Sequence, residues 1–255
     1  GRDHEEYLGD SLEKIAAAKA GIIKSARPVV IGRLPEEAEC VIREMASSKN
    51  SSVISVREEF GDDIAKYPGT NLEGNYQQWN AGTATLAARA LPPKWRITEE
   101  VITRGLERVD WPGRWQRVRI GGRLVILDAS HNPEGAQVLE SNLARLVEET
   151  GRRSVVIAGV LGLNRARPLI DVICRYAQEI HFVVPHQPRA CSHADLTALV
   201  PELFEGRVVR ADIEQLFPTP DVCTAGSKHD VVVVTGSIYL LGEVLSRLAF
   251  GKMLP

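Results

Sequence analysis

An aspartate and a histidine stand three residues apart where an apolar segment gives way to a helix. Residues 123–127 (Arg-Leu-Val-Ile-Leu) predict a buried strand, and Asp128 and His131 follow it directly. In open α/β sheets, ligands bind beyond the carboxyl ends of the strands, at the turn into the next helix. Pro133 suits the first turn of that helix, because the N–H that it lacks would have no partner there. The position therefore indicates a binding site, although Asp128 and Asn132 could instead simply cap the helix.

The rest of the chain predicts the elements that would position these residues. After residue 115, apolar strand-like runs alternate with amphipathic segments, and Gly121-Gly122 indicates a hairpin. The expected strands cover residues 115–120, 123–127, 154–160, 179–184, 207–210 and 230–235, and the expected helices cover residues 134–150, 168–177 and 238–248, with further helices after Ser192 and Asp212. Such alternation implies an α/β fold, in which a mostly parallel, doubly wound, Rossmann-like sheet is covered by helices on both faces.

The first 110 residues have a different pattern. Their expected helices cover residues 12–19, 36–47, 80–91 and 97–109, their expected strands cover residues 28–32 and 52–56, and a loop rich in Gly, Pro and Asn covers residues 61–78. A boundary falls near Asp110-Trp-Pro-Gly113. We therefore predict two domains, at residues 1–110 and 111–255.

Composition narrows the classes of function. Hydrophobic residues make up 44% of the 255 residues and charged residues 25%, a balance typical of globular proteins. The formal net charge of −2 comes from interspersed signs and offers no basic face for nucleic acid. No apolar run approaches the ~20 residues needed to span a bilayer. The polar start has no signal-peptide pattern, and the four cysteines form no CxxC pair, so we expect a cytoplasmic chain with reduced thiols.

Four segments, taken in order, carry a resemblance to a known family. They are Asp3-His4 with Leu8-Gly9 and Leu12-Glu-Lys-Ile-Ala16, then Lys19-Ala-Gly-Ile22, then Pro112-Gly-Arg-Trp-Gln116, and finally residues 128–136. Together they resemble the folylpolyglutamate synthase and dihydrofolate synthase family of the Mur-ligase superfamily. Gly236-Ser237 after the last expected strand resembles the closing motif of that family.

The resemblance implies a reaction. ATP phosphorylates a carboxylate, and the amine of L-glutamate attacks the resulting acyl phosphate to form an amide. The substrates implied are a folate or dihydropteroate together with L-glutamate, the cofactors implied are ATP and Mg²⁺, and the enzyme implied is a monomer. Phosphoryl transfer needs cations that neutralise the developing charge, and the matched residues include several.

Two of the matched residues would bind the magnesium ion. His4 matches a magnesium-binding histidine, and Lys19 matches a lysine that the family carries as a carbamate, which makes Lys19 both a metal ligand and a catalytic candidate. A carbamate requires a lowered amine pKa, which the alanines around Lys19 could favour by providing apolar surroundings. From position alone, His4 would be an ordinary exposed histidine and Lys19 an ordinary lysine of an alanine-rich helix.

Five matched residues would contact the nucleotide. Arg114 matches an arginine that reaches the phosphates, and its guanidinium suits such anions. Asp128 and His131 match residues that hold the ribose and phosphates, and His131 is also a catalytic candidate. Gln77 and Asn80 match a Gln and an Asn close to the nucleotide. The alternatives are a surface ion pair for Arg114 and a helix cap for Asn80.

The chain also departs from the family pattern. Tyr76 stands where many relatives have histidine, and residues 163–167 (Leu-Asn-Arg-Ala-Arg) replace an acid-lysine-acid signature. No GxxxxGK[ST] phosphate loop is present, so we expect this polypeptide alone to be inactive in ATP turnover and to represent the back part of an ATPase domain plus a complete C-terminal domain. Another Mur-type ligase and a non-catalytic fragment remain alternatives, whereas a Rossmann dehydrogenase is disfavoured because no GxGxxG follows a strand.

Overall fold

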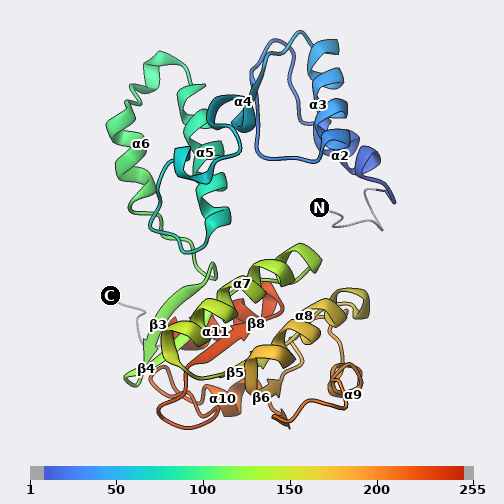
Figure 1. Cartoon of the computed structure of the whole chain (residues 1–255), viewed down its shortest axis with the longest axis vertical. Helices are drawn as coiled ribbons and strands as arrows, with labels where there is room; N and C mark the ends of the chain where they lie inside the picture. Colours follow the sequence, from blue (N-terminus) through green and yellow to red (C-terminus); the bar gives the residue numbers. More distant parts are fainter. Residues whose placement is uncertain (1–8, 250–255) are drawn as a thin grey trace. The chain divides into compact units, whose positions relative to one another are not determined.

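The structure is a computed structural model that describes residues 9–249 (Figure 1). The chain divides into two compact units, residues 1–110 and residues 111–255, which we describe separately. Within residues 9–249, no helix combines the length and the apolar character that crossing a membrane requires.

The C-terminal unit is built on a six-stranded sheet with the order β3-β4-β8-β5-β6-β7. Only β3 runs antiparallel, in the hairpin with β4 that Gly121-Gly122 predicted. The other neighbours are parallel. The strands are β3 (Gln116–Ile120), β4 (Arg123–Leu127), β5 (Ser154–Ala158), β6 (Ala177–Phe182), β7 (Arg207–Arg210) and β8 (Val232–Thr235).

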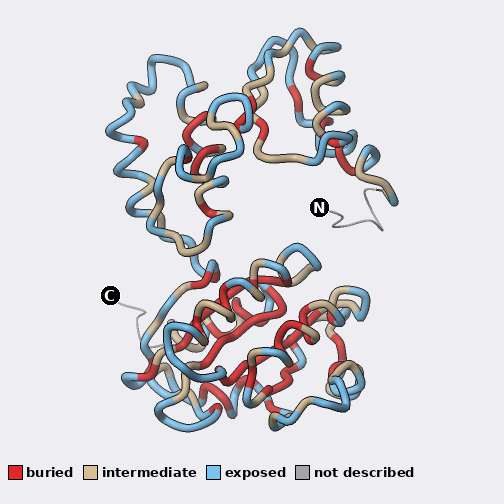
Figure 2. Tube along the Cα trace, viewed as in Figure 1, coloured by how far each residue is buried: buried red, intermediate tan, exposed pale blue. Residues whose placement is uncertain are grey.

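Helices cover both faces of this sheet. The helices α7 (Pro133–Thr150), α8 (Leu163–Tyr176) and α9 (His193–Ala198) pack on one face, and α10 (Ile213–Leu216) and α11 (Ile238–Ala249) pack on the other. Alternate residues of each central strand enter the two apolar cores, so that Val156 faces α7 and Val155 faces α11. Figure 2 shows the resulting continuous buried band through the sheet. The predicted doubly wound α/β fold is confirmed.

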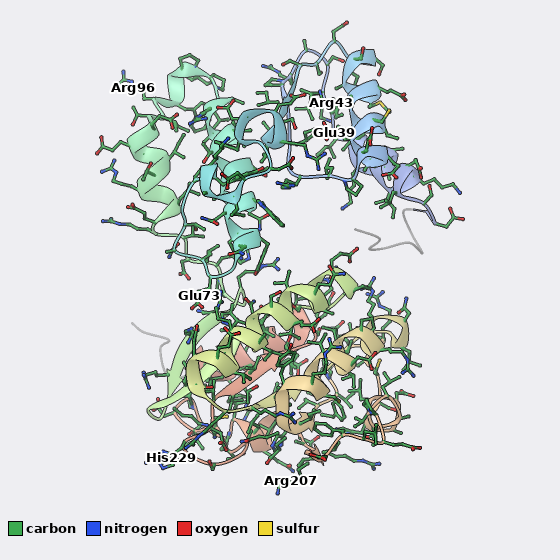
Figure 3. The ribbon with its side chains drawn as sticks, in the orientation of Figure 1. Glu39, Arg43, Glu73, Arg96, Arg207 and His229 are labelled. Carbon is green, nitrogen blue, oxygen red and sulfur yellow. The ribbon has the colours of Figure 1, made fainter. Side chains whose placement is uncertain are left out.

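The N-terminal unit is less layered. Its strands β1 (Val29–Ile31) and β2 (Val53–Ser55) form a two-stranded parallel sheet. Its helices are α2 (Leu12–Ala20), α3 (Glu36–Ser48), α4 (Val56–Phe60), α5 (Asn75–Arg89) and α6 (Glu99–Leu106), and single 3₁₀ turns lie at Ile64–Lys66 and Pro93–Trp95. An ion pair one turn apart supports α3, where Arg43 Nη2 lies 2.6 Å from Glu39 Oε1 (Figure 3).

Two helices begin five residues earlier than the sequence predicts. Helix α8 starts at Leu163, not at residue 168, and therefore contains Pro168 in its interior. The proline forfeits one backbone hydrogen bond, but the apolar face formed by Ala166, Leu169, Ile170 and Ile173 is fully buried and holds the helix to the sheet. Helix α5 starts at Asn75 after Gly74, which adopts a φ of +105° that favours glycine.

Candidate functional site

Three parallel strands of the C-terminal unit end side by side. The amide of Asp128, just beyond β4, donates to the carbonyl of Val234 on β8 at 2.9 Å. The amide of Gly236, just beyond β8, donates to the carbonyl of Ser130 at 3.0 Å, and the amide of Gly159 beyond β5 donates to Thr235 at 3.3 Å. The segments that follow β4, β8 and β5 are therefore tied together at the carboxyl edge of the sheet, where ligands bind in this class of fold.

Glycine is required at one point of this edge. Gly236 has a φ of +104°, and a Cβ atom there would lie 2.8 Å from the carbonyl oxygen of Gly159. A side chain would force the loops beyond β8 and β5 apart. Gly236 thus permits the close backbone approach on which the edge depends.

Asp128 is the buried carboxylate of this edge, with 2% of its surface exposed. Its Oδ1 accepts a hydrogen bond from the amide of Ser130 at 3.1 Å. Burial raises the pKa of Asp128, while hydrogen bonds from Ser130, the positive charge of Arg114 and a hydrogen bond from the backbone of Trp115 act in the opposite direction. The helix cap is Asn132, whose Oδ1 accepts from the amide of Gly135 at 2.7 Å. The alternative of capping is therefore right for Asn132 and wrong for Asp128.

Arg114 is exposed between two buried residues, Gly113 and Trp115. The loop around it is fixed from both sides, because the amide of Gly113 donates to Gln116 Oε1 at 3.1 Å and its carbonyl accepts from the amide of Ala129 at 2.8 Å. Trp115 has a left-handed φ of +53° and is 1% exposed. A bulky residue keeps such a conformation only where its surroundings determine it. The loop thus presents one exposed guanidinium, whose positive charge acts on the Asp128 carboxylate.

His131 is half-buried and oriented by the backbone. Its Nδ1 lies 2.8 Å from the carbonyl oxygen of Ala129. A carbonyl only accepts, so Nδ1 is the protonated nitrogen in this contact. Arg114, Asp128 and His131, which the sequence places in two separate segments, thus belong to one edge of one sheet.

The predicted Gln77 and Asn80 lie together in the N-terminal unit. Both belong to α5, and Asn80 Nδ2 donates to Gln77 Oε1 at 3.0 Å. Gln77 is buried, and its Nε2 donates to the hydroxyl of Tyr76 at 3.1 Å. Asn80 lies within the helix, so the alternative that it caps a helix is wrong.

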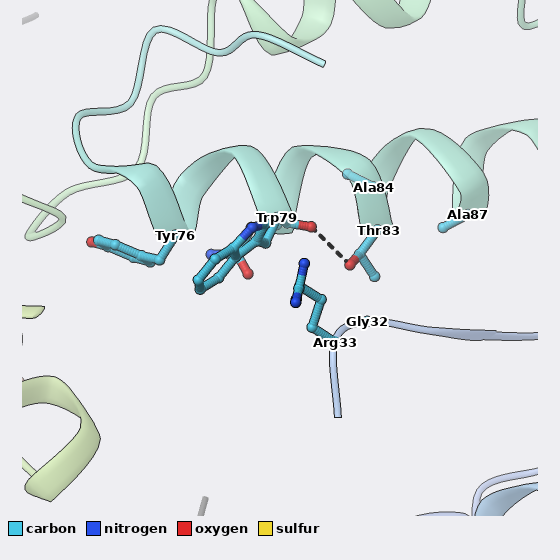
Figure 4. Close-up of a pocket in the computed structure, with 8 residues that line it drawn as sticks. Gly32, Arg33, Tyr76, Trp79, Thr83, Ala84 and Ala87 are labelled. Carbon is cyan, nitrogen blue, oxygen red and sulfur yellow. Dashed lines mark hydrogen bonds between the residues drawn. The ribbon is translucent and has the colours of Figure 1, made fainter. Parts of the chain in front are cut away.

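Asn80 also lines a cavity of about 510 Å³ beside α5, which we call the α5 pocket (Figure 4). Its wall includes Arg33, whose guanidinium carbon lies 5.1 Å above the centre of the Trp79 ring. The Arg33 Nη2 atom also contacts Asp62 Oδ1 at 2.7 Å. The pocket therefore combines an amide, a stacked cation and an aromatic ring.

Of the two residues predicted to bind metal, the structure describes only Lys19. His4 lies outside the described residues. Lys19 is exposed in the last turn of α2, where Ala16 and Ala20 are buried but Ala17 and Ala18 are exposed. The expectation that its alanines provide an apolar setting is therefore wrong within this unit. No group of three or more His, Cys, Asp or Glu side chains suited to a metal ion occurs among residues 9–249.

Sequence reasoning missed the residues that support the edge. Ser130 and the backbone of Trp115 both form hydrogen bonds with Asp128. Ser130 lies within the segment that the sequence singles out, so its place after the strand is a usable signal. Nothing in the sequence marks the left-handed conformation of Trp115.

The segment that contains this edge matches a family model. Residues 113–238 match the model for the glutamate ligase domain of Mur ligases. The matched segment includes Arg114, Asp128 and His131 together with the closing Gly236-Ser237.

Over its whole length, the chain is similar to ligases of the folate branch. A folylpolyglutamate synthase of Lacticaseibacillus casei is 31% identical over 98% of this chain and 60% of its own length. A folylpolyglutamate synthase structure from Mycobacterium tuberculosis, complexed with ADP and AMPPCP, is 25% identical with a TM-score of 0.72, covering 98% of this chain and 62% of that one. Escherichia coli FolC in complex with DHPP and ADP shares the fold, at 22% identity and a TM-score of 0.74, over 99% of this chain and 60% of that one. The chain thus spans about 60% of the length of the relatives that it matches.

Proposed function

We propose that this chain forms part of an ATP-dependent ligase that joins L-glutamate to a folate or to dihydropteroate through an acyl phosphate. The proposal rests on one observation above all: the buried carboxylate of Asp128 and the exposed Arg114 lie on segments that the hydrogen bond from Ala129 to Gly113 joins at the carboxyl edge of the parallel sheet. That is where an α/β fold binds anionic ligands, and the family relationship of residues 113–238 supports a ligase.

Each residue of the edge has a proposed task. Arg114 offers the phosphates a planar, permanently charged donor. Asp128 orients that charge and accepts from a nucleotide hydroxyl, and His131 offers Nε2 as a second acceptor, because its Nδ1–H is bound to Ala129. Because the Asp128 carboxylate is buried and the loop of Arg114 is fixed, the positions of their charges change little during the reaction. Charges held in place in this way can stabilise the charge that develops in the transition state.

The N-terminal unit contributes amides in this proposal. Gln77 and Asn80 are held in a fixed orientation by their mutual hydrogen bond. The amide of Asn80 can donate and accept at once, as recognition of a nucleobase requires. We propose that these two amides contact a nucleotide, the class of ligand that the ADP complexes of the relatives contain.

Magnesium is proposed only through the family. The described residues do not by themselves form a site for it, since Lys19 is exposed and lies in no carboxylate cluster. No step of the proposed reaction is assigned to the metal, and the roles of His4 and Lys19 as metal ligands stay predictions. The monomeric state and the cytoplasmic location likewise stay predictions.

Nucleotide binding by the purified chain tests the proposal directly. ADP should bind with a Kd on the order of 1 mM or tighter, and Arg114→Ala should weaken binding at least ~10-fold because a charge-assisted contact to phosphate is lost. Arg119→Ala is the matched control, since Arg119 is exposed on β3 and donates to the carbonyl of Gly122. Equal ADP affinity in all three proteins would refute the role of Arg114.

The reaction itself requires a phosphate loop. Radiolabelled glutamate should be incorporated into tetrahydrofolate, and not into a muramyl nucleotide, by a polypeptide that carries these 255 residues together with such a loop. The 255-residue chain alone should give no product, because no GxxxxGK[ST] segment occurs in it. Transfer to the muramyl nucleotide would redirect the proposal to cell-wall ligases.

A further inference from the structure

A second concave site lies at the opposite edge of the C-terminal sheet, which we call the basic pocket. It has a volume of about 250 Å³ and is lined in part by Arg152, Arg153, Ser154, His229 and Asp230. Ser154 begins β5, and His229 lies in the loop before β8 (Figure 3). The pocket is therefore at the amino ends of these strands, and the length of β5 places it ~13 Å from the carboxyl edge.

The local chain path explains how two arginines come to this place. Helix α7 ends at Thr150, and Gly151 adopts a φ of +67° that turns the chain back toward the sheet. Arg152 and Arg153 make up the rest of this turn and are both exposed. The next residue, Ser154, already pairs in β5, so the backbone places both arginines at the start of the strand.

Ser154 supplies the most specific observation. It is 2% exposed, and among the described residues its Oγ has no hydrogen-bond partner. Side chains alternate along a strand, and Val156 packs in the core beneath α7 and α8, so Ser154 faces the same side, beneath the end of α7. A buried hydroxyl without a partner costs about 1–3 kcal/mol. An acceptor bound in the pocket would remove that cost.

The charges around Ser154 favour an anion as that acceptor. Among residues 9–249, neither Arg152 nor Arg153 forms an ion pair, whereas Arg117 and Arg145 nearby both contact Glu149. Adjacent, unpaired guanidinium groups repel each other, and a bound oxyanion would relieve that repulsion.

Two features oppose an anion, and both are weakened by local bonds. The Asp230 carboxylate already accepts from the amide of Ser227 at 2.7 Å and from Gln178 Nε2 at 3.0 Å. The end of α7 carries roughly half a negative charge, but Thr150 Oγ1 donates to the carbonyl of Leu146 at 2.7 Å and Gly151 caps Val147 at 2.8 Å. Asp230 keeps its negative charge, which the adjacent Arg123 opposes, so Arg152 and Arg153 give the pocket an excess of positive charge.

We propose that the basic pocket binds one small oxyanion, a phosphate or carboxylate group, held by Arg152 and Arg153 with the Ser154 hydroxyl donating to it. The volume sets the size class, because it falls below the ~300–1,000 Å³ of typical sites for larger ligands. Inorganic phosphate and free L-glutamate are two sources of the same chemistry, and the experiment separates them. The site is independent of the proposed ligase activity.

Calorimetric titration of the full 255-residue chain tests this site. Inorganic phosphate and L-glutamate are titrated separately, with chloride holding the ionic strength constant. One of them should saturate a single site with a Kd on the order of 1 mM. The double variant Arg152→Gln/Arg153→Gln should bind at least ~10-fold more weakly. Arg210→Gln should bind normally, because Arg210 is exposed at the end of β7 and does not line the pocket.

Two further variants separate this site from folding effects and from the carboxyl edge. Without ligand, Ser154→Ala should be at least as stable as the parent chain, since it removes a buried, unpartnered hydroxyl. Its gain in Tm from the bound anion should be smaller than that of the parent. Arg114→Gln should leave anion binding to the basic pocket unchanged. Binding that is lost in Arg114→Gln but kept in the double variant, or no saturation by either anion, would overturn the proposal.

Discussion

The two units of this chain differ sharply in how much apolar surface they bury. The C-terminal unit contains apolar clusters of 20 and 17 buried residues on the two faces of its sheet. The N-terminal unit has two clusters of only three buried residues each. Parallel strands are normally covered on both faces, and a two-stranded sheet is marginal by itself. We therefore expect the C-terminal unit to be the more stable of the two.

The same contrast applies to the two sets of proposed nucleotide contacts. Asp128 and Arg114 stand on strand ends and on a loop locked by backbone hydrogen bonds. Asn80 stands on α5, in a unit whose described apolar clusters contain three buried residues each. A site on a packed sheet is held more accurately than one on a lightly packed helix. We therefore expect substitutions in the C-terminal unit to have the larger consequences.

The largest effect is expected in the core beneath α7. Leu143 is fully buried, so Leu143→Ala should lower the free energy of unfolding of the C-terminal unit by ~3 kcal/mol, through lost burial and the cavity that remains. Urea unfolding monitored by hydrogen exchange assigns the change to this unit. The control is Leu203→Ala, because Leu203 is 92% exposed and its loss should change stability by less than ~0.5 kcal/mol.

The same measurement could also contradict the expected difference in stability between the two units. If both units lost protection together at one urea concentration, they would unfold as one cooperative body. The burial difference between them would then not translate into separate stabilities.

The next largest effect concerns turnover. In a ligase that contains this chain and a phosphate loop, Arg114→Ala or His131→Ala should lower kcat/KM by ~100-fold or more, as the loss of groups that stabilise developing charge does. Steady-state kinetics with ATP as the varied substrate measures it. Arg119→Ala, on the same unit, should keep parental kinetics, and parental rates in the Arg114 variant would exclude its role in phosphate stabilisation.

A smaller effect is expected in the N-terminal unit. Asn80→Ala removes one hydrogen-bonding group from a less rigid part of the chain and should weaken ADP binding by ~10-fold. Asn75→Ala is the matched control, since Asn75 is exposed at the start of the same helix. An Asn80 effect larger than that of Arg114 would reverse the comparison and place the main nucleotide contacts in the N-terminal unit.

Local patterns made much of this fold predictable. Strand β4 covers the residues expected from its apolar run, and α7 begins one residue before the expected start. The hairpin between β3 and β4 followed from two glycines. Each of these signals lies within a few residues of the element that it specifies.

Features that depend on distant contacts were not predictable. The approach of Gly236 to Gly159 joins residues 77 positions apart, and the sequence marks only the glycines. Pro168 suggested the start of α8, but burial of the helix face against the sheet extends the helix past it. The exposure of Lys19 likewise depends on what packs around α2, which its alanine-rich sequence does not specify.

The smallest effect is a pH dependence in which two histidines of the C-terminal unit act in opposite directions. Burial lowers the pKa of His181, and the charges of Arg207 and Arg123 add to this, against the hydrogen bond and charge of Glu179. The unfolded chain therefore binds the proton more readily, and stability should fall as the pH drops below ~6.5. By contrast, the hydrogen bond to Glu243 raises the pKa of the exposed His186, so its contribution is present in acid and is lost as the pH rises through the raised pKa.

Substitution separates the two histidines. His181→Gln should flatten the loss of Tm between pH 7.5 and pH 5.5, because the buried group that resists protonation is gone. His186→Gln should steepen the same loss, because it removes a group that gains stability in acid. Thermal unfolding of both variants and the parent across this range checks the signs. Parallel pH profiles for all three proteins would mean that neither ring is coupled to folding, and that the acid response of this unit comes from its carboxylates.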